Sequence, residues 1–325
     1  MTNAKAVISG VGSYVPENRL TNFDLEKIMD TSDEWIMERT GISERRIVGP
    51  NETTSDLAYY ASINALESAR LQPEELDLII VATETPDHMF PPVAARLQKK
   101  LGCANIGAYD VHSTCVGFIS SLQIAEQYIK SGKFANILVV GADTLSRIVD
   151  YDDRSTAILF SDGAGAFIVS KSEQQDCEGI IYSSIHSDGT YYKDLYVTNV
   201  DHQENPTFEK QKIIMNGSKI FKLAVQGMTD SIRQTLATTG SNITDIDWLI
   251  PHQANQRIML AVARNLEMPL EKVVDNIKNY GNNSAATIPL AFDTALKKNK
   301  IERGDRLMLT AFGGGLLWGS LYLEF

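Results

Sequence analysis

The chain has 325 residues, of which 43% are hydrophobic and 22% are charged, a composition typical of a globular protein of one or two domains. Its net charge of −11 argues against a nucleic-acid-binding protein, which needs a basic surface. No apolar stretch approaches the roughly 20 residues that span a bilayer, and residues 1–5 lack the features of a signal peptide, so we expect a cytoplasmic protein without a membrane partner.

Strand-like segments alternate with helical patterns along the chain, which predicts an α/β fold. In the first half the predicted elements are, in chain order, a strand over 6–10, a helix over 56–71, a strand over 75–80, a helix over 92–101, a strand over 107–111, a helix from about 116, and a strand over 136–140.

The second half repeats this series. Residues 75–80 resemble 245–250, and residues 136–140 align with 306–310, so both pairs are separated by the same offset along the chain. Its other predicted elements are a strand over 179–183 and helices over 220–238 and 257–266. A shared offset across several elements indicates two homologous halves. We place them at 1–172 and 173–325, with the junction in the polar segment Lys171–Asp176.

Cys115 lies at the predicted turn between the strand over 107–111 and the helix that follows. Free backbone N–H groups and the helix dipole at such a turn lower a thiol pKa and favour a nucleophile. The alternative is core packing, the commoner role of a free cysteine. The other cysteines, Cys103 and Cys177, are sparse and not at CxxC spacing, so we expect neither a disulfide framework nor a metal site.

The repeat places two further polar residues at strand ends that face a cleft between the halves. His252 follows the strand over 245–250, and Asn282 lies in the turn equivalent to that of Cys115. Each has an ordinary alternative role, as a backbone-bonded histidine or as a turn former. Gly313–Gly315 fits either a tight bend or a close approach of backbone N–H groups to a ligand. Together these residues are typical of an acyl-transfer site.

Other catalytic motifs are missing from the sequence. It has no complete dinucleotide fingerprint, no Walker-type GK[ST] and no G-x-S-x-G elbow.

Eight longer motifs follow one another along the chain: Val11–Val15, Asp30–Ile36, Arg39–Ile42, Asp153–Thr156, Asp162–Ala166, Pro251–Asn255, Gly281–Ala286 and Gly313–Gly319. In this order they resemble the β-ketoacyl-acyl carrier protein synthase III family of condensing enzymes. The resemblance implies a thiolase-like fold, in which two homologous βαβα halves pack as a five-layered αβαβα sandwich.

The resemblance also implies an activity. The protein would be an acyltransferase that condenses an acyl-CoA starter with malonyl-acyl carrier protein, giving 3-oxoacyl carrier protein, CoA and CO₂ at the start of type II fatty acid synthesis. Cys115 would carry the acyl group, and His252 and Asn282 would stabilise the enolate formed by decarboxylation. The backbone N–H groups of Cys115 and Gly314 would form an oxyanion hole. Coenzyme A enters as part of the substrate, and no cofactor or metal is expected.

By the same resemblance, one set of residues would bind CoA or the carrier protein: Thr31, Trp35, Arg39, Arg154, Gly217, Lys222, Asn255 and Arg257. Trp35 would stack on adenine, with Arg154 covering its other face. Lys222 and Arg257 would supply a local basic patch for the acidic carrier protein. The acyl pocket would be formed by Phe90, Val116 and Phe312, with Phe90 crossing the interface of a homodimer into the pocket of the partner.

The segment around Cys115 departs from the pattern usual in the family. His112 and Val116 flank the cysteine where small residues are common, and Asn283 replaces a common threonine. Val116 is bulky and stiff at χ1, so an acetyl preference does not follow from the resemblance. Two alternatives remain: a synthase III-like enzyme of secondary metabolism, and a catalytically silent partner subunit. Such silent subunits lack the cysteine that this chain has.

Overall fold

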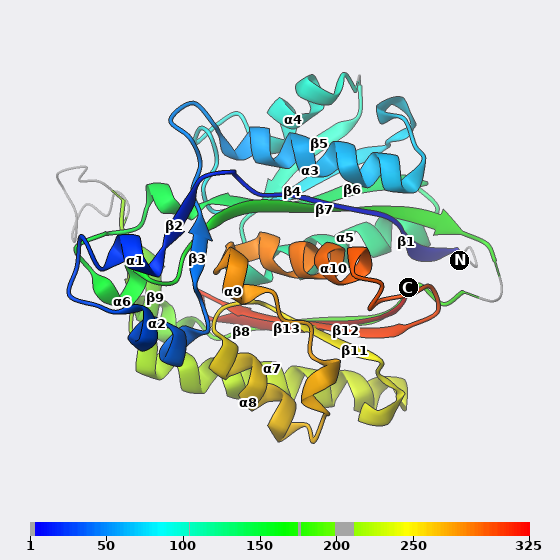
Figure 1. Ribbon diagram of the computed structural model, residues 1–325. Coiled ribbons are helices and arrows are strands. Elements are labelled where there is room, and N and C mark those ends of the chain that lie inside the picture. The colour runs from blue at the N-terminus through cyan, green and yellow to red at the C-terminus, as the bar shows by residue number, and fades with distance from the viewer. Residues whose placement is uncertain (1–3, 104, 175–176, 199–210) are drawn as a thin grey trace.

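The computed structural model describes residues 4–103, 105–174, 177–198 and 211–325. Two β-sheets and three layers of helices alternate in it, which confirms the five-layered α/β fold (Figure 1). The helix layers, from the top of Figure 1, are α3 (Thr54–Ala69) with α4 (Val93–Leu101), then α5 (Gly117–Lys130) with α10 (Thr287–Lys297), then α7 (Gly217–Thr239) with α8 (Gln256–Asn265).

The first sheet is built by the first half of the chain. Its strands, in spatial order, are β1 (Lys5–Tyr14), β7 (Asp162–Ser172), β6 (Asn136–Thr144), β4 (Leu78–Ala82) and β5 (Gly107–Val111). β4 is parallel to both β5 and β6, whereas β7 is antiparallel to both of its neighbours. β4 is buried along its whole length, as expected for a strand with helices on both faces. β5 forms one edge of the sheet.

The second sheet has the same design. Its strands are β11 (Trp248–Pro251), β12 (Arg306–Gly313), β13 (Leu317–Glu324) and β8 (Ile180–Ser187), with the same sequence of one parallel and two antiparallel pairings as β4, β6, β7 and β1. The two halves are therefore structural repeats. The expected junction at 172/173 falls between β7 and β8 and stays a prediction, and Gln175 and Asp176 lie outside the described residues.

The two central helices start from equivalent turns. The short helix η2 (Thr114–Val116) precedes α5, and η7 (Ser284–Ala286) precedes α10, at the same offset that separates the repeated strands. Thr114 and Ser284 both have left-handed backbones, with φ of +47° and +50°. Such conformations are uncommon for side chains larger than glycine, and tertiary contacts must hold them. The two turns pack against each other at the centre of the molecule.

The core between the sheets fixes the central helices. Phe118 of α5, Phe167 of β7 and Phe292 of α10 make two edge-to-face contacts with ring centroids 4.9 Å apart. Because these rings lock α5 and α10 onto the same strand, the turns at the helix starts are held in place as well.

Among the described residues, no helix combines the length and the apolar character of a membrane span.

The remaining elements are short and lie outside the layers. They are β2 (Arg19–Thr21), α1 (Asn22–Leu25), α2 (Asp33–Thr40), β3 (Glu44–Arg46), η1 (Pro73–Glu75), η3 (Leu145–Arg147), α6 (Arg154–Ala157), η4 (Gly189–Asp194), β9 (Leu195–Val197), β10 (Ile213–Met215), η5 (Ile243–Asp245), η6 (Leu270–Lys272) and α9 (Ile277–Tyr280). Several of them, including α1, α2 and α6, gather at one end of the sandwich, opposite the C-terminus (Figure 1).

Candidate active site

Cys115 lies in η2 and forms part of the wall of a cavity of about 760 Å³. The cysteine is half-buried, so it is reached from the cavity and backed by the protein interior. The polar residues of its lining include Glu84, His112 and Ser284. Its apolar lining includes Leu145, Ile148, Phe160, Leu195 and Ile213. The volume lies within the usual range of small-molecule sites.

The glycines at the end of β12 bring a second backbone segment against Cys115. A Cβ atom on Gly313 would lie 2.9 Å from the backbone N of Cys115 and would overlap the hydroxyl of Thr114. The Thr114 hydroxyl donates to the carbonyl oxygen of Gly314 at 3.0 Å. Only residues without side chains fit this close approach. Gly314 therefore lies beside Cys115 in the same cavity wall.

Burial raises the pKa of the Cys115 thiol to about 12. The charges of Asp143 and Glu84 act in the same direction, while the hydroxyl of Ser284 and the backbone N–H of Cys115 oppose the rise by hydrogen bonding. The lowered pKa expected from the helix start is therefore wrong for the free protein. The start of the helix does supply donors, but desolvation and two nearby carboxylates outweigh them.

Asp143, at the end of β6, is the more deeply buried of these two carboxylates. Its Oδ1 accepts hydrogen bonds from the backbone N–H groups of Glu84 and Thr85, at 2.8 and 3.1 Å, and from the hydroxyls of Thr83 and Thr85. Burial raises its pKa to about 6 in spite of these bonds. With this pKa Asp143 is mostly ionised at neutral pH, and its charge acts on the Cys115 thiol.

We expect Asp143→Asn to lower the pKa of Cys115, because a neutral amide does not repel the thiolate. The amide keeps the oxygen that accepts the four hydrogen bonds. A shift of half a pKa unit changes the thiolate fraction about threefold near neutral pH. The rate of Cys115 alkylation by iodoacetamide, followed by intact mass across neutral and alkaline pH, measures this change.

Asp162→Asn is the matched control, because Asp162 is also buried and its pKa is also raised to about 6, yet it is not one of the charges that act on Cys115. An alkylation profile that moves equally in both variants would contradict a specific effect of Asp143.

Glu84 connects the polar wall of the cavity to the nucleophile turn. Its Oε1 accepts the backbone N–H of Thr114 at 2.7 Å, and its Oε2 lies 3.4 Å from Nδ1 of His112. The hydrogen bond with Glu84 raises the pKa of His112, with further contributions from the charges of Glu84 and Asp110, although burial opposes them. From the sequence, His112 was identified only as a difference from the usual family pattern, and Glu84 was not identified. Glu84 lies two residues after the end of β4, and this position at a strand end could have indicated it.

His252 lies just after β11 and is buried, with 2% of its surface exposed. Its backbone N–H donates to the carbonyl of Thr310 at 2.7 Å, and its Nδ1 lies 2.6 Å from the hydroxyl oxygen of Thr287. Burial lowers the pKa of His252 to about 3, so the imidazole is neutral at physiological pH. This neutrality matches the uncharged polar group expected at this position.

Asn282 is held by both its backbone and its side chain. Its backbone N–H donates to the carbonyl of Leu159 at 3.0 Å, and its own carbonyl accepts the N–H of Ser161 at 2.9 Å. Its Oδ1 accepts the backbone N–H of Ser284 at 2.9 Å. Because the oxygen is fixed by that donor, the amide orientation is fixed too, and Nδ2 remains available as a donor.

The turn η7 joins the three candidate catalytic residues. The Ser284 hydroxyl contacts the thiol of Cys115, its N–H holds Asn282, and its carbonyl oxygen lies 2.9 Å from the hydroxyl of Thr287, which contacts His252. Sequence analysis missed Ser284 and Thr287. The repeat offset was a usable signal for Ser284, since Thr114 is its counterpart in the first half of the chain.

The three expected acyl-pocket residues lie in different surroundings, and their role stays a prediction. Val116 is fully buried in the core between the sheets, because the η2 turn directs it away from the cavity. Phe312 is also buried, with 5% exposed, in the core beneath the second sheet. Phe90 is 81% exposed on the loop after β4, and its neighbour Met89 lines the cavity.

The candidate CoA-binding residues form a separate region outside the cavity wall. The guanidinium carbons of Arg154 and Arg39 lie 4.5 and 4.7 Å from the centroid of the Trp35 ring, both within the range of cation–π contacts. Asn255 donates its amide to the carbonyl of Arg39 at 2.9 Å and so connects α8 to α2. The hydroxyl of Thr31 is buried without a hydrogen-bond partner among the described residues.

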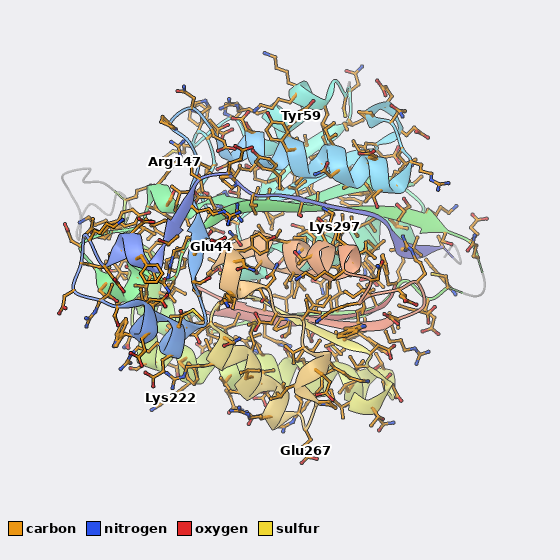
Figure 2. All side chains as sticks on the ribbon, viewed as in Figure 1. Glu44, Tyr59, Arg147, Lys222, Glu267 and Lys297 are labelled. Carbon is orange, nitrogen blue, oxygen red and sulfur yellow. The ribbon has the colours of Figure 1, made fainter. Side chains whose placement is uncertain are left out.

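The candidate carrier-protein residues are exposed basic side chains near the starts of α7 and α8. Lys222 extends from the outer surface of α7 (Figure 2). Arg257 lies in the first turn of α8, with its guanidinium 5.7 Å from the ring centroid of Phe221. Gly217, the first residue of α7, is exposed about one and a half turns before Lys222.

Two family models match the chain. Residues 109–189 match the model described as 3-oxoacyl-[acyl-carrier-protein] synthase III, and residues 236–325 match the C-terminal model of the same description. β-Ketoacyl-[acyl-carrier-protein] synthase III of Xanthomonas euvesicatoria pv. vesicatoria is 47% identical over 321 residues, 98% of each chain. The protein of that name from Clostridium acetobutylicum is also 47% identical over 321 residues, again 98% of each chain.

Solved structures show the same likeness. The 3-oxoacyl-[acyl-carrier-protein] synthase III of Aquifex aeolicus superposes with a TM-score of 0.93 at 46% identity, covering 98% of this chain and 100% of that one. The priming β-ketosynthase of the R1128 polyketide pathway superposes with a TM-score of 0.94 at 33% identity, covering 99% and 96%.

Proposed function

Because the chain belongs to the β-ketoacyl-[acyl-carrier-protein] synthase III family, we propose that Cys115 is the nucleophile of the family's condensation. The protein is an acyltransferase that joins an acyl-CoA starter to malonyl-acyl carrier protein and so initiates fatty acid synthesis. One observation carries the role of Cys115. It is the cysteine in the wall of the cavity, and it is linked through η7 to a neutral buried histidine and an oriented amide.

In the first step the sulfur of Cys115 bonds to the thioester carbonyl carbon, the bond from that carbon to the CoA sulfur breaks, and the thiol proton ends on the CoA thiol. Because the pKa of the free thiol is about 12, the proton leaves during the attack and not before it. The backbone N–H groups of Cys115 and Gly314 stabilise the negative oxygen of the tetrahedral intermediate.

In the second step the malonyl group loses CO₂, and the electrons of the broken C–C bond move to the thioester oxygen as an enolate. Neutral donors suit this charge, and the proposed donors are Nε2–H of His252 and Nδ2–H of Asn282. The enolate carbon then attacks the acyl group on Cys115. The sulfur leaves as a thiolate and takes up a proton from the solvent, and 3-oxoacyl carrier protein is released.

Trp35, Arg39 and Arg154 are proposed to bind the adenine of CoA. Both guanidinium groups lie over the ring in the free protein, so one of them moves aside when adenine stacks on Trp35. Thr31, Gly217 and Asn255 would contact the rest of the CoA arm. Lys222 and Arg257 are proposed to attract the acidic carrier protein, since a protein of charge −11 needs a local basic surface for such a partner.

A homodimer is proposed to complete the acyl site. β5 is an edge strand of the first sheet, and the nearby Met89 and Phe90 are 84% and 81% exposed. Exposed apolar side chains next to an open strand edge are typical of an interface. Met89 lines the cavity of its own chain, and Phe90 would extend into the cavity of the partner.

Turnover of acetyl-, isobutyryl- and octanoyl-CoA with malonyl-acyl carrier protein tests the function. We expect at least one starter to give the 3-oxoacyl carrier protein by mass spectrometry, with one CO₂ and one CoA per product. An acyl-enzyme that forms but never condenses with malonyl-acyl carrier protein would contradict the proposal. A preference for unusual starters would favour the priming role of the R1128 relative, which at 33% identity is more distant than the fatty acid synthases at 46–47%.

A further inference from the structure

The contact between His252 and Thr287 determines where the histidine carries its proton. His252 Nδ1 and the Thr287 hydroxyl oxygen are 2.6 Å apart, and the two residues are only 2% and 1% exposed. Within the described residues this is the only hydrogen bond of the imidazole. A neutral imidazole has one N–H, either on Nδ1 or on Nε2, and the bond made by one nitrogen fixes the state of the other.

The Thr287 hydroxyl has one hydrogen and two nearby acceptors, Nδ1 of His252 at 2.6 Å and the carbonyl oxygen of Ser284 at 2.9 Å. If the hydrogen points to Ser284, Nδ1 must carry the imidazole proton, and Nε2 is left as an acceptor. If it points to His252, Nδ1 accepts, and Nε2 carries the proton. Nε2 can donate a hydrogen bond to an enolate oxygen only in the second arrangement, whereas in the first its lone pair would repel that oxygen.

The second arrangement is the one that the proposed donor role of Nε2 requires. The Ser284 carbonyl already accepts the backbone N–H of Thr287, so it does not depend on the hydroxyl. When Nε2 carries the proton, Nδ1 is an acceptor, and among the described residues only the Thr287 hydroxyl can donate to it. A buried acceptor without a hydrogen bond would be costly. The shorter of the two contacts is also the one to His252.

We infer that Thr287 is a positioning residue, whose hydroxyl donates to Nδ1 of His252 and so holds the imidazole in the Nε2–H tautomer. The inference rests on the proposed role of His252 in decarboxylation. Thr287 touches neither substrate nor reacting atoms. It ensures that the nitrogen facing the substrate is a donor, without a charged imidazolium that the buried site disfavours.

Thr287→Val tests this, because valine keeps the shape of the side chain and removes the hydroxyl. We expect Cys115 to be acylated as in the wild type, while malonyl-acyl carrier protein is decarboxylated about tenfold to a hundredfold more slowly. Thr287→Ser restores the hydroxyl and is expected to recover most of the rate. Thr229→Val is the matched control, since the buried hydroxyl of Thr229 has no hydrogen-bond partner among the described residues. Wild-type decarboxylation in Thr287→Val would overturn the inference.

The tautomer itself can be read from ¹⁵N chemical shifts of the histidine side chains, since the chain has only five histidines and His252→Ala identifies the resonance. We expect the His252 proton on Nε2 in the wild type and in Thr287→Ser. A proton on Nδ1 in the wild type overturns the inference, even where Thr287→Val does not fold. A wild-type protein that fails to acylate or condense would instead contradict the proposed function, and the ¹⁵N result would still decide the tautomer.

Discussion

Cys115→Ala is expected to abolish formation of the acyl-enzyme, because no other thiol of the described residues lines the cavity. Incubation with acyl-CoA followed by intact-mass measurement should show the mass of one acyl group on the wild type and none on the variant. The alanine fits the half-buried site, so the thermal unfolding of the variant should stay close to that of the wild type.

Cys103→Ala is the matched control for this experiment. Cys103 is buried in the core between α3, α4 and the first sheet, where burial raises its pKa and its thiol contacts the carbonyl of Pro73 at 3.2 Å. We expect the control variant to be acylated as the wild type is. A persistent acyl adduct on Cys115→Ala would show that another residue carries the acyl group.

His252→Ala is expected to separate the two half-reactions. Acylation of Cys115 should continue, while decarboxylation of malonyl-acyl carrier protein should fall by about 10²–10³, the usual effect of removing one donor from an oxyanion site. Release of labelled CO₂ from malonyl-acyl carrier protein, measured on pre-acylated protein, reports the second step alone.

His186→Ala controls for the loss of an imidazole. His186 stacks on Trp318 with ring centroids 5.9 Å apart and does not line the cavity. Its removal should leave the decarboxylation rate unchanged. Undiminished CO₂ release from His252→Ala would refute the enolate-stabilising role of His252.

The sequence predicted the repeated elements well, because each has a strong local pattern. The strand over 107–111 is β5, and the segments paired by the common offset became β4 with β11 and β6 with β12. The order of strands in each sheet was not predictable from these patterns. It depends on which faces pack together: β7 pairs antiparallel with β1, and β13 pairs antiparallel with β8, and both pairings join segments that are distant in the chain.

The sequence predicted where the candidate catalytic residues lie better than it predicted their protonation, and their roles stay a prediction. Cys115, His252 and Asn282 converge on one turn, as the equivalent strand ends suggested. The pKa of Cys115 was predicted in the wrong direction, because it depends on the depth of burial and on Asp143 and Glu84, which come from other strand ends. The position of Val116 next to Cys115 in the chain likewise did not reveal that its side chain faces the core.

The two halves of the repeat differ at the positions equivalent to the candidate catalytic residues. At the offset that relates the two halves, the counterparts of Cys115 and His252 are Ala285 and Ala82. A Cβ on Gly117 would lie 2.9 Å from the Cβ of Ala82 and 3.8 Å from that of Ala285, so small side chains and a bare backbone close the equivalent position. The fold is duplicated, but the chemistry is not. In the proposed mechanism the first half holds the acyl group on Cys115, and the second half supplies His252 and Asn282 to stabilise the enolate, so the loss of symmetry brings the two reacting groups together.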